Sequence, residues 1–207
     1  YDLFKVGHTS TSVSLATGVA KARDIKGENY NVIALIGDGS LSGGEALEGL
    51  DNAATLGSNI IIVVNDNDMS IAENHGGLYA NLKELRETNG TSENNFFKTL
   101  GFNYKYAANG NSIADMIEAF KSVKDTNHPT VLHIHTQKGH GHKLAEENRE
   151  FYHWIMPGEA DKMPAPSNCE DYNTLTKDFL LNKTNANEPV VVINAGTPGV
   201  FGFNKIA

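Results

Sequence analysis

The sequence is poor in cysteine, in positive charge and in long apolar runs. Cys169 is the only cysteine among 207 residues, which excludes an internal disulfide and a cysteine-rich zinc site and favours a reducing, cytoplasmic setting. Seventeen Lys and Arg stand against 25 Asp and Glu, a formal net charge of −8. This balance argues against non-specific binding to nucleic acids or anionic membranes. No apolar run approaches the roughly 18 residues that a membrane helix needs, so we expect no membrane partner.

Four short apolar runs, rich in β-branched residues, predict strands. Each run is followed by glycine or polar residues, as expected where a strand passes into a turn. Because the runs are almost continuously apolar, we expect strands covered on both faces, as in parallel sheets. The predicted strands are Asn31–Ile36, Asn59–Val64, Thr130–Thr136 and Pro189–Ile193.

Helical periodicity lies between these runs. Ser12–Ile25 carries an apolar face and precedes Gly27, and Ser42–Glu45 predicts a capping box that opens a helix to about Leu56. Alternating strands and helices predict an α/β fold with a doubly wound, mainly parallel sheet and helices on both faces. The helix that opens at Ser42 would bury Ala46, Leu47, Leu50 and Ala54. Further helices are predicted at Leu78–Arg86, at Ser112–Val123, where Ile113, Met116, Ile117 and Phe120 recur at helical spacing, and at Asn173–Leu181. Irregular segments are predicted at Thr88–Asn95, His140–Ala165 and Gly196–Gly202.

Two polar turns follow the first two predicted strands. The first is Gly37-Asp38-Gly39 and the second is Asn65-Asp66-Asn67-Asp68. Open α/β sheets bind ligands at the carboxyl ends of their strands. Glycines and a helix N-terminus favour a phosphate there, and a carboxylate beside phosphate requires a bridging cation such as Mg²⁺. Either turn alone is more often an ordinary turn, but the pair is more specific, since the 25 residues between them (40 to 64) fit one helix and one strand.

The paired turns resemble the thiamine diphosphate motif, and the surrounding sequence resembles 1-deoxy-D-xylulose-5-phosphate synthases. Gly7–Ser12 (GHTSTS) is similar to the GHSSTS segment of that family, and Asn65–Ile71 (NDNDMSI) to its NDNEMSI. Thr136–Glu147 (TQKGHGHKLAEE) resembles its TKKGKGYxPAE, with His153 downstream. The resemblance runs from Tyr1 to about Pro157 and weakly onward. Transketolase is similar, but it typically has Gly-Pro-Leu-Gly where Gly7–Ser12 stands.

The resemblance implies a role for each matching residue. Asp38 and Asn67 would bind the metal through their side chains, and Met69 through its backbone carbonyl. His8 and His153 would act in catalysis by relaying protons or facing the substrate. Ser40 stands where the family usually has Ala, and His142 where it usually has Tyr. The complete cofactor-binding set implied by the resemblance is Gly7, His8, Thr9, Asp38, Gly39, Ser40, Asn67, Met69, Ile71 and His142.

The activity implied by the resemblance is a transferase reaction that depends on thiamine diphosphate and Mg²⁺. Pyruvate and D-glyceraldehyde 3-phosphate would be joined, with release of CO₂, to give 1-deoxy-D-xylulose 5-phosphate for isoprenoid and thiamine synthesis. The family is dimeric, so we expect a homodimer. Residues 1–165 would form the diphosphate-binding domain, and residues 166–207 a linker and the start of a truncated pyrimidine-binding domain. The chain begins without Met and would be a fragment or split subunit that is inactive alone.

Other functions stay open at this stage. The chain could be a transketolase, a subunit of a split transketolase, or a non-catalytic protein that binds thiamine diphosphate. Zinc could bind the histidines, although ordinary strand histidines are the simpler interpretation for His133 and His135; the full candidate set is His133, His135, His140 and His142. Charged helix positions are expected to be solvated or to form i,i+4 pairs; these are Glu45, Asp51, Lys83, Glu84, Arg86 and Glu87.

Overall fold

The computed structural model describes residues 3–163, 171–194 and 196–203. The chain divides into two compact units, which are described separately. The first comprises Tyr1–Ser70 and Asn74–Gln137, and the second Ile71–Glu73 and Lys138–Ala207. The domain boundary predicted at residue 165 and the cysteine at position 169 both fall outside the described residues.

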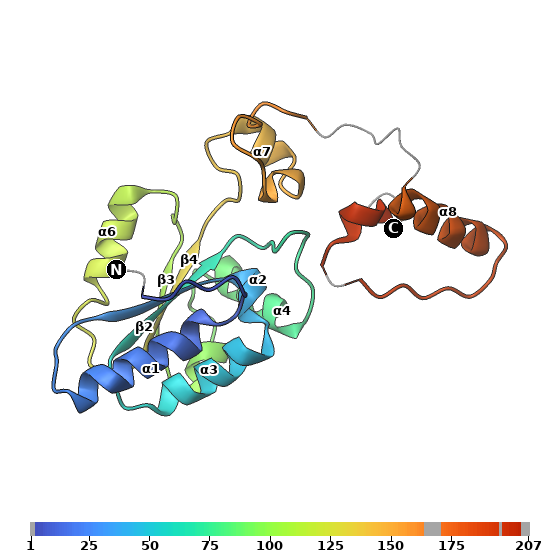
Figure 1. Cartoon of the computed structure of the whole chain (residues 1–207). Coiled ribbons are helices and arrows are strands. Elements are labelled where there is room, and N and C mark those ends of the chain that lie inside the picture. Colours follow the sequence, from blue (N-terminus) through green and yellow to red (C-terminus); the bar gives the residue numbers. More distant parts are fainter. Residues whose placement is uncertain (1–2, 164–170, 195, 204–207) are drawn as a thin grey trace. The chain divides into compact units, whose positions relative to one another are not determined.

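A four-stranded parallel sheet forms the centre of the first unit (Figure 1). Its order is β1 (Val32–Gly37), β2 (Ile60–Asp66), β4 (Thr130–His135) and β3 (Asn103–Ala107). The three strands predicted in this unit are confirmed. β3 was not predicted, because its sequence, Asn-Tyr-Lys-Tyr-Ala, is short and half polar.

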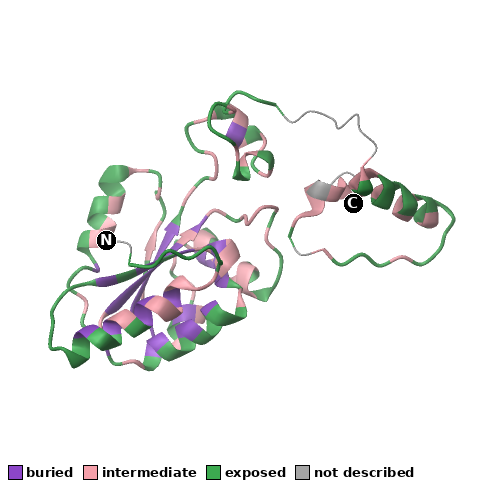
Figure 2. Ribbon diagram, in the orientation of Figure 1, coloured by how far each residue is buried: buried purple, intermediate pink, exposed green. Residues whose placement is uncertain are grey.

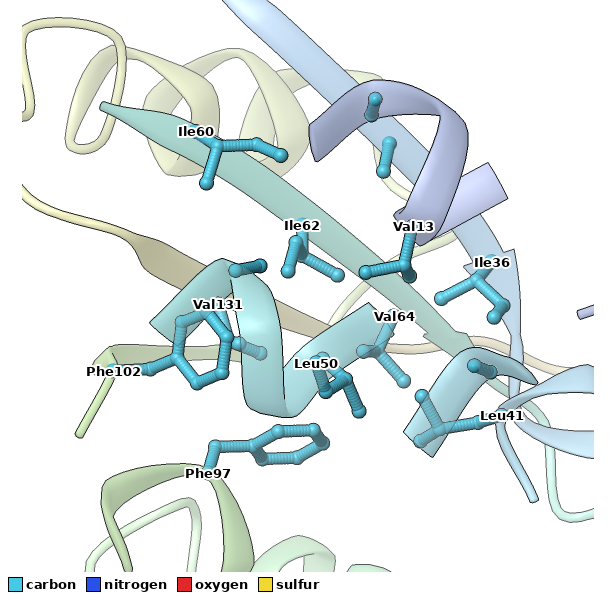
Figure 3. Packing of buried hydrophobic residues seen from close by; sticks show 14 of the residues in the cluster. Val13, Ile36, Leu41, Leu50, Ile60, Ile62, Val64, Phe97, Phe102 and Val131 are labelled. Carbon is cyan, nitrogen blue, oxygen red and sulfur yellow. The ribbon is translucent and has the colours of Figure 1, made fainter. Parts of the chain in front are cut away.

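Helices cover both faces of this sheet, so the predicted α/β architecture is confirmed. On one face lie α1 (Ser12–Ile25), α3 (Gly44–Thr55), α4 (Gly77–Glu87) and α5 (Phe96–Leu100). Their apolar side chains pack against alternate residues of β1, β2 and β4, such as Ile36, Ile62 and Val131 (Figure 3). The opposite face packs against α6 (Ile113–Lys121) through a second, smaller core of Ile61, Val63, Val123, Leu132 and Ile134.

The edge strand β1 departs from the expectation of burial on both faces. Its residues alternate between buried and exposed, and Ile33 and Leu35 are 50% and 65% exposed, whereas β2 is buried almost throughout. The reason is that α6 packs against β2, β4 and β3 and not against β1. The buried residues accordingly gather at the centre of the sheet (Figure 2). The predicted burial of Leu47 in the second helix was also wrong, because this side chain is 37% exposed. Of the apolar residues spaced along α6, Ile113 and Ile117 are exposed as well.

The start of α3 differs from the predicted capping box. The N-cap is Gly43, and no side chain caps it, because a separate short helix, α2 (Asp38–Leu41), precedes it. The Ser42 hydroxyl instead donates to the Gly39 carbonyl at 3.4 Å and accepts from the Tyr79 hydroxyl at 2.7 Å. The turn after β1 is therefore continuous with a helical turn that presents Asp38.

The second unit contains short helices where an irregular segment was predicted. They are α7 (Lys143–Glu147) and the 3-10 helix η1 (Phe151–His153), followed by the expected α8 (Tyr172–Asn185) and the 3-10 helix η2 (Pro198–Phe201). The strand predicted at Pro189–Ile193 was wrong: no strand in the described part of the unit pairs with it, and Ile193 is 95% exposed. Across the described residues, no helix combines the length and apolar character needed to cross a membrane.

Candidate metal and diphosphate site

The carboxyl ends of β1 and β2 lie side by side, because Gly37 pairs with Asn65 at the last step of their ladder. Asp38 follows β1 directly and is only 2% exposed. One carboxylate oxygen accepts a hydrogen bond of 2.8 Å from Asn74 Nδ2. Burial, and then the negative charge of Asp66, raise the pKa of Asp38 to about 7. A buried carboxylate with a raised pKa is well suited to bind a cation, which would stabilise its charged form.

Asn67, in the turn after β2, has a side-chain oxygen in need of a partner. Its Oδ1 atom is buried and forms no hydrogen bond with any described residue. Buried polar atoms are rarely left in this state, so such an atom calls for an explanation. An amide oxygen is a ligand that Mg²⁺ accepts. The side chains of Asp38 and Asn67, at the carboxyl ends of β1 and β2, are therefore of the types that fit a divalent cation.

Gly39 permits a close approach between the two turns. A Cβ atom at this position would lie 2.5 Å from Ser70 Cβ and 2.9 Å from Ser70 Cα. No side chain can occupy that space without moving the backbone. The glycine next to Asp38 is therefore needed for packing against the segment after Met69, in addition to any close approach of a phosphate.

The N-terminal loop is joined to the same region. The Ser10 hydroxyl donates to the backbone carbonyl of Ser40 at 2.7 Å, although Ser10 itself was not predicted as a site residue. Ser10 has a φ of 71°, a left-handed conformation that this hydrogen bond helps to hold. Gly7, His8 and Thr9 immediately precede it and are exposed. The loop therefore carries its predicted cofactor residues to α2.

Asp66 is the centre of a buried polar network that the sequence did not reveal. Its carboxylate accepts two hydrogen bonds from Arg86 Nη1, at 2.8 and 2.6 Å, and lies 2.8 Å from His133 Nε2. Burial alone would raise the pKa of Asp66, but the hydrogen bonds from His133 and Arg86 outweigh burial and lower it to about 2. Asp66 therefore stays ionised.

Both ring nitrogens of His133 are engaged, because Nδ1 lies 2.8 Å from the Tyr104 hydroxyl. The ring is fully buried. His133 thus belongs to the interior of the sheet and has no free nitrogen for zinc. Arg86 also corrects a prediction: it is not a solvated helix residue, since its side chain is 10% exposed and paired. Glu84 likewise accepts hydrogen bonds from Ser92 and Asn94, whereas Lys83 and Glu87 form the expected i,i+4 pair at 3.9 Å.

Three predicted site residues belong to the second unit. The Ile71 carbonyl lies 3.5 Å from Lys138 Nζ, which in turn lies 3.1 Å from His153 Nδ1. His142 caps α7, where its Nδ1 accepts a hydrogen bond of 3.2 Å from the Ala145 backbone. His142 therefore has a local structural task, whatever else it binds.

The first unit thus brings the turns that carry Asp38, Gly39, Ser40 and Asn67 to the same end of the sheet, and Met69 follows two positions after Asn67. Sequence reasoning gave no individual role at this site to Ser10, Asp66 or Asn74. It placed Arg86 among the solvated helix residues and considered His133 only as a strand histidine or a zinc ligand. The sequence held a signal for two of these residues, which lie inside the matched motifs: Ser10 within the GHTSTS segment and Asp66 within the asparagine turn.

Comparison with known proteins places these features in a family. The sequence profile described as 1-deoxy-D-xylulose-5-phosphate synthase matches residues 1–95 and 88–136. The synthase of Clostridium botulinum (strain Alaska E43 / Type E3) is 35% identical over 243 residues, which covers 100% of this chain and 39% of the relative. The synthase of Carboxydothermus hydrogenoformans is 37% identical over 248 residues, with the same shares. The chain therefore spans about two fifths of the length of these relatives.

A solved structure supports the fold. The chain matches transketolase from Campylobacter jejuni with a TM-score of 0.51 and 20% identity, over 68% of this chain and 21% of that one. At this identity the likeness concerns the fold alone, and it agrees with the parallel sheet described above. The profile match and the identity to these synthases show that the chain belongs to the 1-deoxy-D-xylulose-5-phosphate synthase family.

Proposed function

We propose that this chain supplies the metal- and diphosphate-binding part of a thiamine diphosphate-dependent carboligase. The complete enzyme would join pyruvate to D-glyceraldehyde 3-phosphate and release CO₂, giving 1-deoxy-D-xylulose 5-phosphate. Relatives of this family carry the corresponding name. Because the chain spans 39% of the length of those relatives, we assign the reaction to the assembled enzyme and cofactor binding to this chain.

The observation that carries the proposal is the pair of buried oxygen atoms, from Asp38 and Asn67, at the carboxyl ends of β1 and β2. Asp38 is a carboxylate removed from solvent, and Asn67 Oδ1 is a buried acceptor with no partner among the described residues. They follow adjacent parallel strands in register. A carboxylate, an amide oxygen and a backbone carbonyl from Met69 form the hard-oxygen set that Mg²⁺ takes, together with phosphate oxygens and water. The residues therefore fit a diphosphate-bound Mg²⁺.

The remaining predicted residues would hold and orient the cofactor. Gly39 and Ser40, in α2, would contact the diphosphate through backbone and hydroxyl groups. Gly7, His8 and Thr9 would line it from the loop that Ser10 ties to Ser40. Thiamine diphosphate, when bound, would supply the electron sink for carbon–carbon bond formation. His8 and His153 would exchange protons with the reacting groups or donate hydrogen bonds to the substrate.

Calorimetry separates binding from turnover. Thiamine diphosphate is titrated into the 207-residue chain with Mg²⁺ and again with EDTA. We expect saturable binding in Mg²⁺ only, and its loss in Asp38→Ala. Absence of binding in both conditions would contradict the proposal.

The substrate assignment needs the full-length protein. Pyruvate with D-glyceraldehyde 3-phosphate should give CO₂ and the five-carbon product. Turnover of a ketose donor without CO₂ release would instead identify a transketolase. Mg²⁺-dependent cofactor binding without either reaction would identify a non-catalytic protein.

A further inference from the structure

Arg86 holds both sides of the turn that contains Asn67. From α4, its Nη1 donates to both carboxylate oxygens of Asp66 at 2.8 and 2.6 Å, and its Nη2 lies 2.8 Å from Asp68 Oδ1. Asp66 and Asp68 flank Asn67 in the sequence. A planar guanidinium can bind two carboxylates in this way, whereas an ammonium group offers only a compact point charge. Arg86 therefore links the residues before and after the candidate metal ligand.

The turn adopts a backbone conformation that has to be held. Asp68 has a φ of 64°, in the left-handed region that non-glycine residues rarely occupy. Its N–H donates to Asp66 Oδ1 at 3.1 Å. The same Asp66 carboxylate thus fixes Arg86 and the next-but-one backbone amide. With Asp66 and Asp68 held by these interactions, Asn67 Oδ1 is the buried acceptor of the turn that has no hydrogen-bond partner among the described residues.

The partner of Arg86 is itself anchored across the sheet. Asp66 on β2 contacts His133 on β4, and His133 contacts the Tyr104 hydroxyl on β3, each at 2.8 Å. The Thr136 N–H donates to the Asp66 carbonyl, also at 2.8 Å. Asp66 and His133 are completely buried. Three strands therefore fix the carboxylate to which Arg86 binds.

We propose that Arg86 is a positioning residue for the divalent cation: by bridging Asp66 and Asp68 it holds the turn so that Asn67 Oδ1 is presented to the metal. The inference rests on the proposed function, since it concerns the same cation. It assigns Arg86 no contact with the cofactor or the substrate. The positioning role also explains why a buried arginine stands beside a cation site, although the repulsion between the two positive charges opposes cation binding.

Charge and positioning predict opposite changes on removal of Arg86. If only charge mattered, loss of a positive group near the site would strengthen cation binding. If Arg86 holds the turn, its loss weakens cation binding, as is typical for residues that orient metal ligands, by about 10-fold or more. Arg86→Lys keeps the charge but cannot bind both carboxylates with a planar fork, so any weakening in that variant reports geometry.

The experiment measures Mn²⁺ binding to the 207-residue chain in the presence of thiamine diphosphate, from the electron paramagnetic resonance signal of free Mn²⁺. The parent chain is compared with Arg86→Gln, Arg86→Lys and the control Arg23→Gln. Arg23 is also a buried arginine, 2% exposed, but it donates to the Tyr30 and Asn59 carbonyls near the opposite ends of β1 and β2. Urea unfolding of each variant records its stability separately.

We expect Mn²⁺ to bind about 10-fold more weakly to Arg86→Gln and several-fold more weakly to Arg86→Lys, whereas Arg23→Gln loses stability and keeps the parent affinity. If Arg86→Gln does not fold, Arg86→Lys decides the matter. Binding to folded Arg86→Lys as tight as to the parent would overturn this inference alone. A parent chain that binds no Mn²⁺ with thiamine diphosphate would overturn the proposed function and this inference with it.

Discussion

Asp38→Asn should make the metal-free chain more stable at neutral and alkaline pH, at the expense of cation binding. The carboxyl group of Asp38 is buried beside the ionised Asp66, and its pKa is raised from 3.8 to about 7. The unfolded chain ionises this group at its ordinary pKa. Above the ordinary pKa, folding therefore has to place an ionised carboxylate where the protonated form is favoured. The free energy of unfolding consequently decreases as the pH rises towards 7. An amide of the same shape carries no charge and keeps an oxygen acceptor for Asn74 Nδ2.

The size of the effect follows from the pKa difference. A rise from 3.8 to about 7 is some three pH units, and each unit corresponds to about 1.4 kcal/mol. The gain from Asp38→Asn should be small near pH 4, grow between pH 4 and 7, and level off above about pH 7 at no more than roughly 4 kcal/mol. Relaxation around the ionised group would reduce the plateau to about 2 kcal/mol.

Urea unfolding in EDTA at several pH values between 5 and 8 measures this difference directly. The control is Asp51→Asn, on the exposed side of α3, which should change stability by no more than about 0.5 kcal/mol at any pH. An Asp38→Asn chain no more stable than the parent at pH 8 would contradict a raised pKa of Asp38. So would a gain that does not depend on pH.

Three further substitutions test the same region. Asn67→Ala should change the free energy of unfolding of the metal-free chain by less than about 1 kcal/mol, because it removes an acceptor that has no partner among the described residues; calorimetry should show Mg²⁺-dependent cofactor binding lost, and retained binding would contradict the assignment. His133→Leu should cost about 3 kcal/mol in urea unfolding, since it breaks a buried pair with Asp66; a neutral effect would show that the network adds nothing. Gly39→Ala should destabilise by about 1–3 kcal/mol through contact with Ser70, and Ser70→Gly in the same chain should recover part of the loss, whereas simple additivity of the two changes would argue against a direct clash.

The strands β1, β2 and β4 were predictable because each contains a local run of β-branched residues, which indicates a strand. β3 was not, because Tyr104 and Tyr106 alternate with polar residues and the strand gains its stability from pairing with β4. Pro189–Ile193 shows the converse: its residues suit a strand, but a strand also needs a neighbour to pair with. Local sequence therefore identified strand-forming residues and could not identify their partners.

The candidate site was predictable at the residues that belong to its motif, Asp38 and Asn67. Arg86 was not, because a charged residue on an amphipathic helix usually faces solvent, and nothing local shows that this one reaches back 20 positions to Asp66. His133 was ambiguous for a similar reason. A strand histidine can bind metal or hydrogen bonds, and only the packing of Tyr104 and Asp66 on neighbouring strands decides between them.

The assignment of the metal ligands is best tested by anomalous scattering from a crystal of the chain grown with thiamine diphosphate and Mn²⁺. We predict one strong peak between the turns after β1 and β2, with the Asp38 carboxylate and Asn67 Oδ1 each about 2.1 Å from the metal. A peak elsewhere, for example at the histidines of the second unit, or cofactor bound with no metal between these two side chains, would contradict this assignment.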